Sequence, residues 1–89
     1  MPEYALEVAK SVEKDLRKIP TNMHDAFFSE IEGLVSNPFP ESSYKKLKGT
    51  KQSYRLRVGS YRILYEVDPE AMLITIYRIR HRKDSYKNL

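Results

Sequence analysis

Hydrophobic and polar residues alternate most regularly over residues 53–67, in the stretch SYRLRVGSYRILYEV. Two runs with a period of two flank the pair Gly59-Ser60, a pattern typical of antiparallel strands joined by a tight turn. A two-residue loop with glycine first suits a primed turn and fixes the register of the hairpin. The facing pairs are then Val58 with Tyr61, Arg57 with Arg62, Leu56 with Ile63, and Arg55 with Leu64.

The predicted register gives the hairpin two unlike faces, because successive residues of a strand point to opposite sides. One face carries Tyr54, Leu56, Val58, Tyr61, Ile63, Tyr65 and Val67, and the other carries Arg55, Arg57, Arg62, Leu64 and Glu66. Arginines that face each other destabilise a sheet. Either Glu66, another carboxylate or water offsets this repulsion, or an anion binds there. Guanidinium groups suit phosphate, since they bind it bidentately and keep their charge.

The N-terminal half predicts a short strand and two helices. Residues 3–8 alternate weakly, and the apolar spacing of residues 11–19 is helical, with Pro20 ending that helix. Thr21 is the expected N-cap of a second helix that runs to about Ser36. The apolar stripe of this helix is expected in the core, and His24 on its solvated side.

A rigid connection at residues 37–40 and a lysine-rich segment to Lys51 lead to the hairpin. A turn at residues 68–71 follows, and then an almost wholly apolar strand at residues 72–79, expected to be an interior strand buried on both faces. The order β-α-α-β-β-β predicts a single α+β domain over residues 1–89. Two N-terminal helices pack on one face of a small, mostly antiparallel sheet, and the arginine face is open.

The charge is unevenly distributed along the chain. Residues 1–43 hold four bases and eight acids, a net charge of −4, whereas residues 44–89 hold twelve bases and four acids, a net charge of +8. Six of the seven tyrosines also lie in the second half. This combination favours a surface that binds a polyanion, with nucleic acid first. A membrane partner is not expected, because the bases lie mostly on strands and not on an amphipathic helix.

Several classes of chemistry find no support in the sequence. The chain has no cysteine and two histidines, and it has no metal-binding pattern or phosphate-cradling glycine loop. We therefore expect no metal and no cofactor. No apolar stretch resembles a signal peptide or a membrane span, so we expect a soluble cytoplasmic protein.

The remaining constellation of polar residues suits RNA chemistry and consists of Arg55, Arg57, Arg62, His81, Arg82 and Tyr86. RNA carries its own nucleophile, the 2′-hydroxyl, so an enzyme need only align it, stabilise the added charge and shuttle protons. Arginines can stabilise the charge, and a histidine or tyrosine can assist proton transfer. A basic surface without catalysis is the alternative.

Four segments give the chain a family resemblance: VEKDLRKIP at residues 12–20, KKLKG at 45–49, YRLRVGSYRILYEV at 54–67 and HRKDSY at 81–86. Together they resemble the RelE toxins of bacterial and archaeal toxin–antitoxin systems, over nearly the whole chain. The middle segment is shared across the wider RelE/ParE superfamily, and the HRxxxY ending is more specific to RelE.

The resemblance implies a RelE-like microdomain that cleaves messenger RNA in the ribosomal A site and is neutralised by a RelB-like antitoxin. The catalytic residues that it implies are Arg57, Arg62, Arg82 and Tyr86, together with His81, and the expected RNA-binding residues are Arg55, Lys45, Lys46, Lys48 and Lys83. Some family members have lysine where this chain has Arg55 and Arg57, so His81 and Tyr86 become the candidates for the general base. Two alternatives remain: a ParE-like toxin that binds DNA gyrase, and a family member that only binds RNA or its partner.

Overall fold

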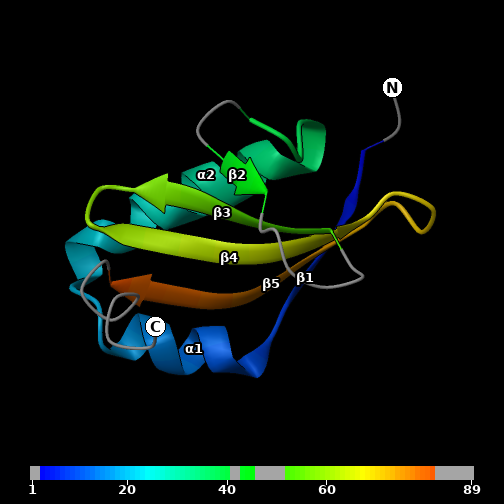
Figure 1. The fold of residues 1–89 in the computed structure, drawn as a ribbon. Coiled ribbons are helices and arrows are strands. Elements are labelled where there is room, and N and C mark those ends of the chain that lie inside the picture. Colours follow the sequence, from blue (N-terminus) through cyan, green and yellow to red (C-terminus); the bar gives the residue numbers. More distant parts are fainter. Residues whose placement is uncertain (1–2, 41–42, 46–51, 82–89) are drawn as a thin grey trace.

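The structure is a computed structural model, and it describes residues 3–40, 43–45 and 52–81. The strands and helices of Figure 1 are, in chain order, β1 (Ala5–Val8), α1 (Lys10–Arg17), the 3-10 turn η1 (Thr21–Met23), α2 (His24–Ser36), β2 (Ser43–Lys45), β3 (Gln52–Val58), β4 (Tyr61–Asp68) and β5 (Leu73–His81). No helix in these ranges is long and apolar enough to cross a membrane.

Five strands form one sheet in the order β1-β5-β4-β3-β2. Only β1 and β5 pair in parallel, so the predicted α+β class with a mostly antiparallel sheet is confirmed. The prediction missed β2, which pairs with β3 at the edge of the sheet. Three residues between a proline-rich connection and a run of lysines are too few to produce a recognisable alternation.

The hairpin of β3 and β4 has the predicted register, including Val58 opposite Tyr61 and Arg57 opposite Arg62. Gly59 has a φ of +60°, and no non-glycine residue of this turn has a positive φ. A positive φ at the first loop position alone is the pattern of a type II′ turn, where glycine has no steric penalty. The turn chemistry therefore sets which side chains share a face.

Both helices pack against one face of the sheet, as predicted. In Figure 1, α2 lies behind β2, β3 and β4, while α1 runs beside β5. A single buried cluster joins Val12 and Ile19 of the first helical region and three residues of α2 to the apolar face of the sheet. The buried residues of the sheet are Leu56, Val58, Ile63, Tyr65, Val67, Ile74, Ile76 and Ile79. This burial leaves the arginine face of the hairpin outside the core.

The junction between the two helices differs from the prediction. Thr21 does not cap a helix with its side chain, because a 3-10 turn begins there and α2 starts at His24. His24 is half-buried, and its Nε2 lies 3.0 Å from the carbonyl oxygen of Leu16 and 3.1 Å from that of Ile19. The imidazole therefore lies against the Leu16 carbonyl, which also accepts the backbone N–H of Ile19, and against the Ile19 carbonyl just beyond α1. The prediction that His24 lies on the solvated side of the helix is wrong.

The connection after α2 is fixed by a buried hydrogen bond. The hydroxyl of Tyr65 donates to the carbonyl oxygen of Pro38 over 2.8 Å, and the Tyr65 residue is fully buried. The Tyr65 ring also stacks on Tyr54, with ring centroids 5.6 Å apart. Because a buried carbonyl without a donor is costly, this bond should hold the connection on the core.

We expect Tyr65→Phe to lower the free energy of unfolding by about 1–3 kcal/mol, since the Pro38 carbonyl would remain buried without its donor. Equilibrium urea unfolding would measure the change. Tyr77→Phe is the matched control, because the Tyr77 hydroxyl makes no hydrogen bond within the described part of the chain. Equal stabilities of the two variants would contradict this role for the Tyr65 hydroxyl.

Candidate nucleic-acid interface

The open face of the sheet carries arginines in two rows that cross the strands. In the row nearest the Gly59 turn, Arg57 of β3 faces Arg62 of β4, which in turn faces Arg80 of β5. In the next row, Leu64 of β4 lies between Arg55 and Arg78. We call these five arginines, Arg55, Arg57, Arg62, Arg78 and Arg80, the arginine surface.

An irregularity in β5 brings Arg78 and Arg80 to this face. Tyr65 pairs with Ile76, but the preceding residue Leu64 pairs with Arg78, so Tyr77 is an extra residue in β5. A β-bulge of this kind shifts the alternation of side chains by one position. Ile79 consequently joins Ile76 in the core, and the arginines on either side of Ile79 turn outward.

The predicted burial of β5 on both faces is therefore wrong. Its helix-facing residues Ile74, Ile76 and Ile79 are buried, while Leu73, Thr75, Tyr77, Arg78 and Arg80 are half-buried. The prediction that β5 is an interior strand is confirmed, since it lies between β1 and β4.

Packing restricts the arginines of β5. The Nε atoms of Arg78 and Arg80 are buried, and neither has a hydrogen-bond acceptor among the described residues. Arg55 and Arg57, by contrast, are exposed, while Arg62 is half-buried. A buried Nε leaves the terminal nitrogens of the guanidinium as its accessible donors, and these are the atoms that form a fork toward phosphate or carboxylate.

The charge of the open face changes along the strands. A third row, further from the Gly59 turn, aligns Ser53, Glu66, Thr75 and Glu7, and beyond it lies Asp68. At the edge of the arginine surface, Asp15 of α1 places Oδ2 3.5 Å from Nε of Arg78. The positive charge is thus concentrated near the Gly59 turn, at the end of the sheet where Arg57, Arg62 and Arg80 align.

The structure separates His81 from the predicted catalytic arginines of the hairpin. His81 faces Tyr61, on the helix-facing side of the sheet, and their ring centroids are 5.0 Å apart in an edge-to-face contact. Tyr61 in turn contacts Phe27 of α2, with centroids 5.5 Å apart. The geometry brings Arg55, Arg57 and Arg62 together but places His81 on the opposite face.

Other predicted site residues lie at or beyond the limits of the described chain. Lys45 lies in β2, where it pairs with Tyr54. The remaining residues predicted to act in catalysis or RNA binding fall outside the described residues: Lys46, Lys48, Arg82, Lys83 and Tyr86.

Sequence reasoning missed Arg78 and Arg80 as members of the surface. The sequence signal for them is the alternation of arginine and isoleucine over residues 78–80. The isoleucines at 74 and 76 occupy even positions and the one at 79 an odd position, so a single alternating pattern does not fit the whole strand. Among the described residues, no group of three or more histidines, cysteines or carboxylates is placed to hold a metal ion.

Comparison with known proteins assigns this arrangement to a family. Residues 6–86 match the sequence model described as the ParE toxin of the type II toxin–antitoxin system parDE. The chain is 36% identical over 88 residues to the putative toxin RelE1 of Methanocaldococcus jannaschii, covering 97% of this chain and 98% of that relative. The chain belongs to the RelE toxin family, within the RelE/ParE superfamily.

Solved RelE structures share the fold. The RelE–RelB complex from Pyrococcus horikoshii gives a TM-score of 0.80 at 27% identity, over 92% of this chain and 97% of that chain. The RelB–RelE complex from Methanococcus jannaschii gives a TM-score of 0.74 at 32% identity, over 93% and 98% of the two chains. The five strands and two helices described here are therefore the RelE fold, with the arginine surface on the sheet face opposite the two helices.

Within this RelE fold, we expect Arg57→Ala to leave the free energy of unfolding within about 0.5 kcal/mol of wild type or slightly above it. The substitution removes a like charge from the position opposite Arg62. Binding to a single-stranded RNA oligonucleotide should weaken, and the slope of log K against log salt should fall by about 0.7 for one lost phosphate contact.

Fluorescence anisotropy over a sodium chloride series would measure this slope. Arg17→Ala is the matched control, because Arg17 is an exposed arginine of α1 outside both rows. If the two variants lose affinity and salt dependence equally, the arginine surface is not where RNA binds.

Proposed function

We propose that this protein is the toxin of a type II toxin–antitoxin pair and acts as a ribosome-dependent endoribonuclease on messenger RNA. The observation that carries the proposal is the row of Arg57, Arg62 and Arg80, aligned across three strands on the open face. The RelE relationship, at 36% identity over nearly the full length of the toxin RelE1, supports the same reaction class.

The reaction that suits this surface is attack of a ribose 2′-oxygen on the adjacent phosphorus. The 2′-hydroxyl loses its proton, the new O–P bond forms, and the bond to the 5′-oxygen of the next nucleotide breaks as that oxygen gains a proton. The products carry a 2′,3′-cyclic phosphate, or its opened form, and a 5′-hydroxyl. Arginines fixed on the sheet would stabilise the extra negative charge on the phosphoryl oxygens.

Proton transfer needs a group other than these arginines, because a guanidinium group keeps its proton at neutral pH. His81 faces Tyr61 on the far side of the sheet, so we do not assign it this task. Tyr86 is the candidate that the family resemblance supplies within this chain. The ribosome would provide the alignment, since in-line geometry is rarely held by a flexible RNA strand.

We expect weak or no cleavage of naked RNA and efficient cleavage of a message on programmed ribosomes. Mapping the 5′ ends of one message, incubated with the protein with and without programmed ribosomes, would measure both. Arg62→Ala and Arg80→Ala should each lower cleavage by about 10²–10³-fold if these residues stabilise the transition state. Arg17→Ala should cleave as wild type does.

Equal cutting with and without ribosomes would reject ribosome dependence, and a folded, fully active Arg62→Ala would reject the catalytic role of that residue.

A second candidate function is that of a ParE-like toxin that binds DNA gyrase, favoured by the match of residues 6–86 to the ParE model. Toxicity in cells, combined with no cleavage of the message either with or without ribosomes, would favour this second function. The ribosomal reaction would take place in the cytoplasm, where messages are translated.

The same proposal includes a RelB-like antitoxin, because the related RelE chains from Pyrococcus horikoshii and Methanococcus jannaschii are complexed with RelB. We propose that an antitoxin segment with acidic and apolar residues covers or distorts the arginine surface. Such a segment would dock as a helix or as an added strand. Its acidic residues would occupy guanidinium groups that otherwise hold phosphate.

Antitoxin binding should therefore compete with RNA and weaken as sodium chloride is raised, since screening reduces attraction between exposed charges. Isothermal titration of the purified pair at several salt concentrations, with and without an RNA oligonucleotide, would measure both effects. Salt-insensitive binding that leaves the arginines of β3 and β4 accessible to RNA would place the control at another surface.

A further inference from the structure

The last five residues of β5 extend beyond their parallel partner. β1 pairs with β5 as far as Val8 opposite Ile76, and the backbone N–H of Ala9 donates to the carbonyl oxygen of Ile76 over 2.8 Å. From Tyr77 to His81, no strand among the described residues pairs with β5 on this side. Backbone groups along such an edge need other partners, or water must solvate them.

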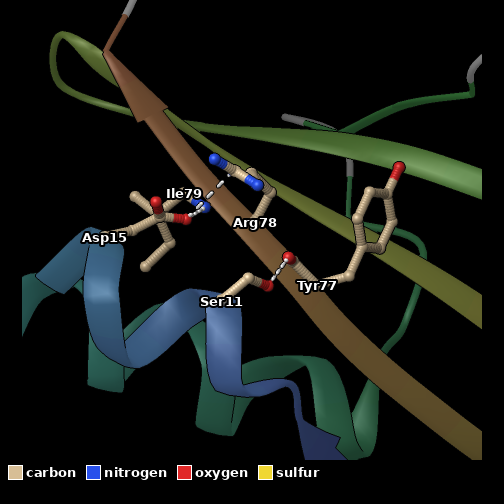
Figure 2. Close-up of polar contacts among 5 residues, drawn as sticks. All are labelled: Ser11, Asp15, Tyr77, Arg78 and Ile79. Atoms are coloured by element: carbon tan, nitrogen blue, oxygen red, sulfur yellow. Dashed lines mark hydrogen bonds and ion pairs between the residues drawn. The ribbon is translucent and has the colours of Figure 1, made fainter.

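Helix α1 supplies a side-chain partner for two of these backbone groups, as Figure 2 shows. The hydroxyl of Ser11 donates to the carbonyl oxygen of Tyr77 over 2.5 Å. Oδ2 of Asp15 accepts the backbone N–H of Ile79 over 2.9 Å. Ser11 and Asp15 are four residues apart, and this spacing puts both on one side of the helix, one turn apart.

The two backbone groups held by α1 lie at the bulge and just after it, on either side of Arg78. Tyr77 is the extra residue, and Ile79 is the first residue whose side chain returns to the core. Without the bulge, the alternation that buries Ile74 and Ile76 would direct Arg78 and Arg80 toward the helices. The bulge therefore decides on which face of the sheet these two arginines lie.

The Asp15 carboxylate also contacts an arginine side chain directly. Oδ2 lies 3.5 Å from Nε of Arg78, and the Asp15 side chain is only 12% exposed, against 43% for that of Arg78. A single, largely enclosed oxygen thus faces the backbone of Ile79 and the side chain of Arg78. The carboxylate accepts the hydrogen bond from the Ile79 N–H more strongly than a neutral oxygen would, and it forms an ion pair with Arg78.

We propose that Ser11 and Asp15 are positioning residues: they stabilise the bulge at Tyr77 and so set the register that puts Arg78 and Arg80 on the arginine surface. Neither residue needs to touch RNA. The inference rests on the proposed function only for its effect on cleavage, because the register of β5 can be measured without any substrate.

The test compares Asp15→Ala, Asp15→Asn and Ser11→Ala with Glu13→Ala, which removes an exposed carboxylate from the same helix. Asparagine keeps an oxygen that can accept the Ile79 N–H but loses the charge. Amide hydrogen exchange of Ile79 and the cross-strand NMR contact between Leu64 and Arg78 report on the bulge. Cleavage on programmed ribosomes reports on the consequence.

We expect Asp15→Ala to speed amide exchange at Ile79 at least about 10-fold and to weaken the NMR contact between Leu64 and Arg78. Cleavage should fall by about 10-fold or more, since a 1 Å misplacement of a reacting group can cost ~10²-fold. Ser11→Ala should show the same changes to a smaller extent. Asp15→Asn should stay within about 3-fold of wild type, and Glu13→Ala should match wild type.

The proposal is overturned if Ile79 exchange and the Leu64 contact in folded Asp15→Ala match those of Glu13→Ala. It is also overturned if Asp15→Asn is as impaired as Asp15→Ala, because charge and not backbone pairing would then be essential. If the wild-type protein cleaves no message, the proposed function fails. The exchange and contact measurements still decide whether Asp15 and Ser11 hold the bulge.

Discussion

The alternation of side chains across a β-strand is the constraint on which this molecule depends. The two-residue turn at Gly59 and Ser60 fixes which residues of β3 and β4 face one another, and the assignment of their side chains to the core or the open face follows from that register. Because the helices cover one face only, the other receives the charged residues. The same pairing that buries Leu56 and Ile63 also aligns Arg57 with Arg62.

Most of the fold could be predicted because its signals are local. The alternation in residues 53–67 and the stripe that buries Phe27, Ile31 and Leu34 both follow from the period of one element. The features that could not be predicted depend on contacts between elements. His24 serves the end of α1 because the short 3-10 turn brings α2 back to it, and the three residues of β2 become a strand only because β3 offers an edge.

The candidate site was predicted in part, for the same physical reason. Arg55, Arg57 and Arg62 belong to the hairpin, whose register follows from its own turn. The faces of Arg80 and His81 instead depend on the bulge in β5, and a period-two pattern gives no warning of an extra residue. A one-position shift explains both differences from expectation: it brings Arg80 into the row of arginines and places His81 beside Tyr61.

The rows of the open face also give the sheet an electrical polarity. Among the described residues, arginines crowd the end near the Gly59 turn, whereas Glu7, Glu66 and Asp68 occupy the far end, so the charge carried by these rows changes along the strands from positive to negative. Summed charges of this kind orient a charged molecule before contact is made. A polyanion bound by these arginines would therefore lie across the strands, from β3 to β5, and would approach the carboxylates if it ran along them. The face therefore selects a direction of approach as well as a sign of charge.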